Sequence, residues 1–104
     1  MGVKEAIEDK IKSKKVMVIA KSTCGYSIMA KNVFADYIKS GGLDKKDYGF
    51  WDIDGEKNCQ AIQDELENMT GARSVPRVFI NGKFFGGGTE VKNAAATGKL
   101  KELL

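Results

Sequence analysis

The chain has 104 residues, which fits one domain of about 100 to 150 residues, and its 42% hydrophobic and 30% charged residues are the balance of a globular protein. It has two cysteines and no histidine, which excludes nucleophiles that rely on a histidine base and zinc sites built from imidazoles or from four cysteines. Seventeen basic and fourteen acidic residues leave a charge of +3 on scattered lysines, and no apolar run approaches ~18 residues, so we expect no nucleic-acid partner and no membrane span.

The first half of the chain alternates between helical and strand patterns. Apolar residues recur at helical spacing between charges over residues 3–13 and predict an amphipathic helix. Residues 16–20 form a continuous apolar run with three β-branched members, which predicts a strand buried on both faces. A helix is expected over residues 25–39, ended by Ser40-Gly41-Gly42. Its inward-facing residues are Ala30, Val33, Phe34 and Tyr37.

The middle of the chain adds a strand, a helix and a hairpin. Residues 48–53 predict a strand, and residues 57–70 predict a helix with Ile62, Leu66 and Met69 on one face. Residues 77–80 and 83–85 predict two strands. The Asn81-Gly82 pair between them is a strong hairpin signal, so these two strands should be antiparallel.

The chain closes with helical sequence from Thr89 onward, with an expected break at Gly98. The first two strands are separated by a helix, and such a crossover implies that they are parallel. We therefore expect an α/β fold in which a mixed four-stranded sheet is flanked by about five helices, with residues 1–104 as a single domain.

Cys24 lies directly after the first strand and at the start of the second helix. The first helical N–H groups lack intrahelical partners and the helix dipole is positive there, so a thiolate is stabilised and the thiol pKa falls. Lys21 adds positive charge three residues earlier. Such a thiolate attacks disulfides without a histidine to deprotonate it, whereas the alternative is a small buried apolar cysteine.

Cys59 has no comparable surroundings in the sequence. It is expected in the first turn of the later helix, and we interpret it as a bystander thiol, although the sequence alone leaves a Cys24–Cys59 disulfide open. Two lone cysteines without a secretory leader favour a reducing compartment, and we expect the cytoplasm.

From about Val3 to Leu104 the chain resembles the glutaredoxins. Three motifs carry the resemblance: Cys24-Gly25-Tyr26-Ser27, the run from Thr70 to Lys83 that reads TGARSVPRVFINGK, and Gly86-Gly87. The resemblance implies a thioredoxin fold, the use of glutathione, and reduction of protein–glutathione mixed disulfides. The expected partners are glutathione and glutathionylated proteins.

The resemblance also implies the site residues. It marks Val75-Pro76 as a cis peptide bond, where the Val75 N–H and C=O present a strand edge to an extended peptide such as glutathione. Cys24 and Ser27 are the expected catalytic residues. The expected glutathione-binding residues are Lys21, Tyr26, Gln63, Arg73, Ser74, Val75, Pro76, Gly87, Gly88, Thr89 and Glu90.

Within that set, each group has a chemical reason. Lys21, Gln63 and Arg73 match family positions near the glycine-end carboxylate of glutathione. The free N–H groups that follow Gly87 suit the γ-glutamyl carboxylate. Glu90 stands where the family often has Asp, which receives the ligand's amino group. Tyr26 is expected to line the cleft beside the thiolate.

The sequence departs from the family's Cys-Pro-Tyr-Cys pattern at Gly25 and Ser27. Without a resolving thiol at residue 27, Cys24 is limited to the monothiol route, in which a second glutathione regenerates the thiolate. Ser27 is either natural, since monothiol members exist, or an engineered replacement for cysteine, and the sequence leaves both open.

Two further functions are open at this stage. Gly25 in place of proline relaxes the loop, so two subunits could each offer Cys24 to a [2Fe–2S] cluster together with two glutathione sulfurs. In that case the protein is a dimer, whereas otherwise we expect a monomer without metal. A thioredoxin-fold binding domain without turnover is the third possibility.

Overall fold

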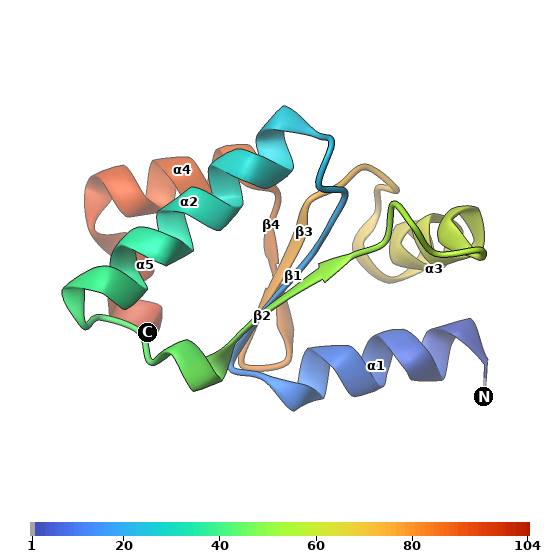
Figure 1. Cartoon of the computed structure of the whole chain (residues 1–104), viewed down its shortest axis with the longest axis horizontal. Helices are drawn as coiled ribbons and strands as arrows, with labels where there is room; N and C mark the ends of the chain where they lie inside the picture. The colour runs from blue at the N-terminus through green and yellow to red at the C-terminus, as the bar shows by residue number, and fades with distance from the viewer. Residues whose placement is uncertain (1) are drawn as a thin grey trace.

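A four-stranded sheet lies between two layers of helices in the computed structural model, which describes residues 2–104 (Figure 1). The strands are β1 (Val16–Ala20), β2 (Tyr48–Asp52), β3 (Arg77–Ile80) and β4 (Lys83–Gly86). Their order is β2-β1-β3-β4, with β2 parallel to β1 and β3 antiparallel to both β1 and β4. The mixed sheet expected from the sequence is confirmed.

Helices cover both faces of this sheet. α1 (Val3–Ser13) and α3 (Cys59–Thr70) lie on one face, and α2 (Gly25–Ser40), α4 (Gly88–Thr97) and α5 (Lys99–Leu103) lie on the other (Figure 1). A short 3₁₀ turn, Lys45–Asp47, leads into β2. No helix within residues 2–104 is long and apolar enough to cross a membrane.

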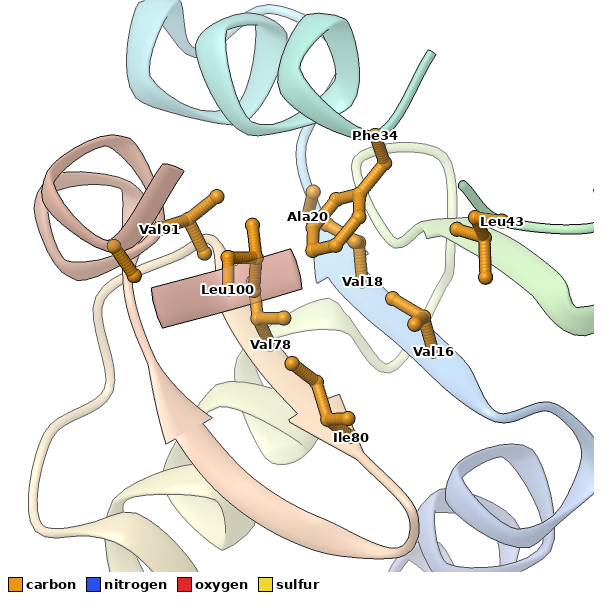
Figure 2. Close-up of a cluster of buried hydrophobic side chains, with 10 residues drawn as sticks. Val16, Val18, Ala20, Phe34, Leu43, Val78, Ile80, Val91 and Leu100 are labelled. Atoms are coloured by element: carbon orange, nitrogen blue, oxygen red, sulfur yellow. The ribbon is translucent and has the colours of Figure 1, made fainter. Parts of the chain in front are cut away.

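β1 supplies residues to the cores on both faces, because successive side chains of a strand point in opposite directions. Val16, Val18 and Ala20 join the core under α2 and α4, shown in Figure 2. Met17 and Ile19 join the core under α1 and α3. All five residues are buried, which confirms the prediction of a strand covered on both faces.

α2 and α3 bury the faces that the sequence pattern predicts. Ala30 and Phe34 are fully buried, and Val33 and Tyr37 pack partly buried against the same core. On the other face of the sheet, Ile62 and Leu66 of α3 are buried in the second core and Met69 packs against it.

The end of β2 and the start of α3 differ from the prediction. β2 ends at Asp52 and not at residue 53, because the Asp52 carboxylate accepts hydrogen bonds from the backbone N–H groups of Ser22 (3.1 Å) and Asp54 (3.0 Å) and turns the chain. α3 begins at Cys59 and not at residue 57, because the Cys59 N–H first donates to the Glu56 carbonyl in a turn.

The hairpin and the C-terminal break are confirmed by the backbone. Asn81 and Gly82 have φ values of 53° and 80°, the left-handed pair required by a tight two-residue turn between β3 and β4. Gly98, with φ of 80°, separates α4 from α5. β4 extends one residue beyond the prediction, to Gly86, because Gly86 pairs with Val78.

Candidate active site

Cys24 is the N-cap residue of α2, at the end of the segment that leaves β1. Its side chain is partly exposed, and its thiol is free. The fold places the thiol where the first N–H groups of α2 point toward it. This is the position expected from the sequence.

The surroundings of the Cys24 thiol lower its pKa. The main cause is the backbone N–H of Ser27, followed by the backbone N–H of Tyr26, the Ser27 hydroxyl and the positive charge of Lys21. Desolvation by the surrounding residues raises the pKa but does not cancel the donors. The Cys24 thiolate therefore forms at lower pH than that of an ordinary cysteine.

Ser27 is fully buried at the first turn of α2. Its hydroxyl oxygen accepts a hydrogen bond from the Lys21 N–H at 3.3 Å, and so links the end of β1 to the helix that follows Cys24. Ser27 thus serves the thiol in two ways, as a hydrogen-bond donor and as a tie across the loop.

The loop before β3 meets Cys24 from the other half of the chain. The Val75-Pro76 peptide bond is cis, as the resemblance implies. The Cys24 thiol lies 3.8 Å from the Val75 carbonyl oxygen, to which it donates when protonated. Loss of the proton removes this donor and leaves the Val75 carbonyl free to accept from another peptide.

A groove of about 270 Å³ runs beside the thiol, from the Val75-Pro76 loop to the start of α4. It is lined by Arg77 and by eight of the eleven residues expected to bind glutathione. These eight are Tyr26, Ser74, Val75, Pro76, Gly87, Gly88, Thr89 and Glu90. Three segments that are far apart in the sequence therefore form one continuous surface.

The start of α4 is held close to α2 at this groove. A Cβ atom on Gly88 would lie 3.1 Å from the Tyr26 carbonyl oxygen and 3.2 Å from the Tyr26 Cβ, so only glycine fits without displacement. The Glu90 carboxylate accepts a hydrogen bond from the Gly87 N–H at 2.7 Å. One carboxylate oxygen of Glu90 is therefore engaged with its own helix start.

Lys21, Gln63 and Arg73 are not among the residues that line the groove. Gln63 is buried, and its amide group donates to the Arg73 carbonyl oxygen at 3.0 Å. The Arg73 guanidinium lies 3.2 Å from the Asp64 carboxylate in an exposed ion pair. Arg73 directly precedes Ser74 of the groove lining, and Gln63 is hydrogen-bonded to Arg73.

Cys59 begins α3 and is partly buried, with its sulfur 3.7 Å from the Gln63 side-chain oxygen. Cys24 and Cys59 are both free thiols, so the disulfide left open by the sequence is not formed in this structure.

Arg77 is the groove residue that the sequence reasoning missed. The sequence pattern predicts it as the first residue of a strand, and it directly follows Pro76 in the longest motif, without a binding role. Side chains alternate along a strand, so Arg77 lies on the same face of the sheet as Phe79, toward α3. This alternation is the sequence signal from which the direction of the Arg77 side chain could have been predicted.

Comparisons with known proteins agree with this geometry. The sequence profile of the glutaredoxin family matches residues 16–85. The chain is 39% identical to glutaredoxin-1 of Mus musculus over 97 residues, which covers 92% of the chain and 86% of that protein. It is 38% identical to the mitochondrial glutaredoxin-2 of Bos taurus over 101 residues, or 94% of the chain, but spans only 58% of that protein's length.

Solved structures show the same fold. The crystal structure of oxidized glutaredoxin 2 from Chlamydomonas reinhardtii superposes with a TM-score of 0.85 at 43% identity, covering 100% of this chain and 94% of that one. The buckwheat glutaredoxin–glutathione complex gives a TM-score of 0.86 at 32% identity, covering 98% and 86%. The chain belongs to the glutaredoxin family and has the thioredoxin fold, as the resemblance implied. Its homologues glutaredoxin-1 and glutaredoxin-2 are glutathione-dependent oxidoreductases.

Proposed function

We propose that this protein reduces protein–glutathione mixed disulfides through Cys24 alone. The observation that carries the proposal is the Cys24 thiol of lowered pKa beside a groove formed by Val75 and the start of α4. Residues 1–104 then act as a single glutaredoxin domain, with glutathione as co-substrate.

The groove offers complementary groups to an extended, doubly carboxylated peptide. The Val75 N–H and C=O pair with the cysteine of glutathione, whose sulfur then faces Cys24. The first N–H groups of α4, beyond Gly87, receive the γ-glutamyl carboxylate, because they lack partners within the helix. The second oxygen of Glu90 is the group for the ligand's amino nitrogen.

The reaction conserves one disulfide at each step. The Cys24 thiolate attacks the glutathione sulfur of the mixed disulfide, a Cys24–glutathione bond forms, and the substrate protein leaves as a thiolate that takes a proton from water. A second glutathione thiolate then attacks the bound glutathione sulfur. Glutathione disulfide leaves, and the Cys24 thiolate is restored. Ser27 has no sulfur with which to close an internal disulfide.

The test is turnover of a glutathionylated peptide in the presence of glutathione, together with the intact mass after mixing with oxidised glutathione. We expect one glutathione adduct and full turnover in the parent protein and in Cys59→Ser, and neither in Cys24→Ser. Turnover that survives Cys24→Ser, or depends on Cys59, rejects the proposal.

Glutathionylated proteins are the proposed partners, the protein is proposed to work as a monomer, and the cytoplasm is the proposed compartment. The glutaredoxin-2 relatives are named mitochondrial, so the compartment needs its own test. Localisation of the tagged natural protein by microscopy distinguishes the two.

A [2Fe–2S] cluster shared by two copies is the second candidate. Within residues 2–104 no three histidine, cysteine or acidic side chains gather at a metal-binding distance, so one chain does not supply the ligands by itself. The favouring observation is that two large apolar side chains in the first turn of α2, Tyr26 and Ile28, are 60% and 47% exposed, and contact with a second copy would cover them. Colourless, iron-free, monomeric protein after anaerobic reconstitution with glutathione rejects this candidate.

A further inference from the structure

Arg77 makes contacts that tie the two ends of the loop between α3 and β3. One guanidinium nitrogen, Nη2, donates to the Ser74 hydroxyl at 3.2 Å, and the other, Nη1, lies at the long distance of 3.5 Å from the Thr70 hydroxyl. Thr70 is the last residue of α3, and Ser74 directly precedes Val75. The guanidinium therefore spans the loop that presents the Val75 peptide edge.

The arginine is held in place from the opposite side as well. Its guanidinium carbon lies 5.1 Å from the ring centre of Phe84 on β4, a cation–π contact. Its Nη2 atom lies 3.4 Å from the position that a Cβ on Gly87 would occupy, so the guanidinium reaches the N-cap of α4. The Arg77 side chain thus contacts both walls of the groove.

Two features set Arg77 apart from an ordinary surface arginine. Its Nε atom is buried without a hydrogen-bond partner. This placement costs free energy, which the other contacts of the guanidinium must offset. Within residues 2–104 the two ion pairs are Lys46–Asp44 and Arg73–Asp64, so the Arg77 charge is not neutralised by a carboxylate. A charge-assisted hydrogen bond to Ser74 is stronger than a neutral one under these conditions.

We propose that Arg77 is a positioning residue for glutathione binding, which acts by holding Ser74 and with it the Val75 peptide edge. The proposal rests on the function proposed above and adds a residue outside the set assigned from the sequence. Arginine is suited to this role because its planar fork presents a different nitrogen to each hydroxyl, whereas lysine carries a single nitrogen on a flexible stem.

The test is a double-mutant cycle on ligand binding, read out without turnover. The dissociation constant of S-methylglutathione, which cannot form a disulfide, is measured for the parent, Arg77→Lys, Ser74→Ala and the double variant. We expect each single change to weaken binding about three- to tenfold, the size of a lost hydrogen bond to a positioned group, and the double variant to be no weaker than the weaker single variant.

Controls separate this effect from charge, folding and the proposed function. Lys83→Gln removes one positive charge from neighbouring β4 and should leave the dissociation constant within about twofold of the parent. The rate of Cys24 alkylation by iodoacetamide should be unchanged in Arg77→Lys, because the thiol's own donors remain. If the parent protein binds S-methylglutathione but shows no turnover, the proposed function is contradicted. The double-mutant cycle on binding can still be interpreted in that case.

Three results overturn the role of Arg77. Parent-like binding in Arg77→Lys shows that charge and not the fork is used. Additive losses in the double variant show that Arg77 acts independently of Ser74. Absence of S-methylglutathione binding in the parent removes the ligand that Arg77 is proposed to position.

Discussion

At the residue scale, Cys24 has the environment that a thiol nucleophile needs in a chain without histidine. The N–H groups of Ser27 and Tyr26 act as fixed donors to the sulfur, so the proton can go directly to water and no neighbouring base is required. The donors belong to a helix start, and their positions are therefore set by the backbone of α2 rather than by flexible side chains.

The first prediction is that the pKa of Cys24 is lower than that of an unperturbed cysteine. The rate of alkylation by iodoacetamide, followed in Cys59→Ser so that one thiol reacts, should reach half its maximum at a lower pH than in the same protein unfolded in urea. Because the folded pKa is the lower one, the associated stability is present above the unfolded pKa and is lost as the pH falls through the folded pKa. A midpoint at or above the usual value contradicts the assignment of Cys24 as the nucleophile.

The second prediction concerns Tyr48, whose buried hydroxyl has no hydrogen-bond partner and whose ring packs 5.7 Å from Phe34. Burial raises the pKa of Tyr48 to about 12. The neutral form is favoured in the folded state, so this contribution to stability is present below about pH 10 and is lost as the pH rises toward 12.

Tyr48→Phe should therefore keep or raise the free energy of unfolding at pH 7, by up to about 1 kcal/mol, because an unpaired polar atom is removed. It should also reduce the loss of stability between pH 10 and 12, measured by urea unfolding at each pH. A variant less stable than the parent at pH 7 would mean that the hydroxyl has a partner, such as a buried water molecule.

At the element scale, the groove depends on how closely α4 approaches α2. Gly88 is the contact point, because the Tyr26 backbone and the Met29 side chain lie only 3.1 to 3.2 Å from the position that a Cβ atom on Gly88 would occupy. Because the Tyr26 carbonyl belongs to the backbone of α2, a methyl group here requires that backbone to shift by a few tenths of an ångström.

The third prediction is that Gly88→Ala lowers the free energy of unfolding by about 1 to 3 kcal/mol, the usual cost of overpacking. It should also weaken glutathione binding, because the first N–H groups of α4 shift with the helix. Gly25→Ala is the matched control: nothing lies within 4 Å of a Cβ at that site, so we expect unfolding within about 0.5 kcal/mol of the parent. Equal unfolding energies for the two variants would contradict the tight contact.

At the scale of the whole molecule, the two cores are joined through the sheet. β1 contributes alternate residues to each, so neither layer of helices can separate without exposing one face of the same strand. The active site draws on both sides of this arrangement, since Cys24 begins a helix of one layer and the Val75 loop follows a helix of the other.

The fourth prediction is a single unfolding transition that responds to damage in either core. Phe34→Ala and Leu66→Ala remove fully buried side chains from opposite faces of the sheet. Each should lower the free energy of unfolding by about 2 to 5 kcal/mol without splitting the transition or changing its denaturant dependence. Separate transitions by near-UV and far-UV circular dichroism would show two independent units.

Much of this architecture was accessible from local pattern. A continuous apolar run predicts the strand over residues 16–20, and residues that favour positive φ predict the Asn81-Gly82 hairpin and the break at Gly98. These signals involve only a few neighbouring residues. The start of α3 and the end of β2 were missed by one or two residues, because they depend on hydrogen bonds that backbone N–H groups donate to the Asp52 carboxylate and the Glu56 carbonyl.

The sequence by itself determined the order of elements, the family, and the place of Cys24 at a helix start, because these depend on motifs and short-range periodicity. Eight of the groove residues were expected from the motifs, whereas only the tertiary structure added Arg77 to them and left Gln63 outside the lining. Gln63 turns inward to the Arg73 carbonyl, whereas Arg77 lines the groove wall and ties down Ser74. The direction of a polar side chain depends on the loop conformation that the fold gives to its partners, and hydrophobic periodicity does not reveal that conformation even when the partners are close in sequence.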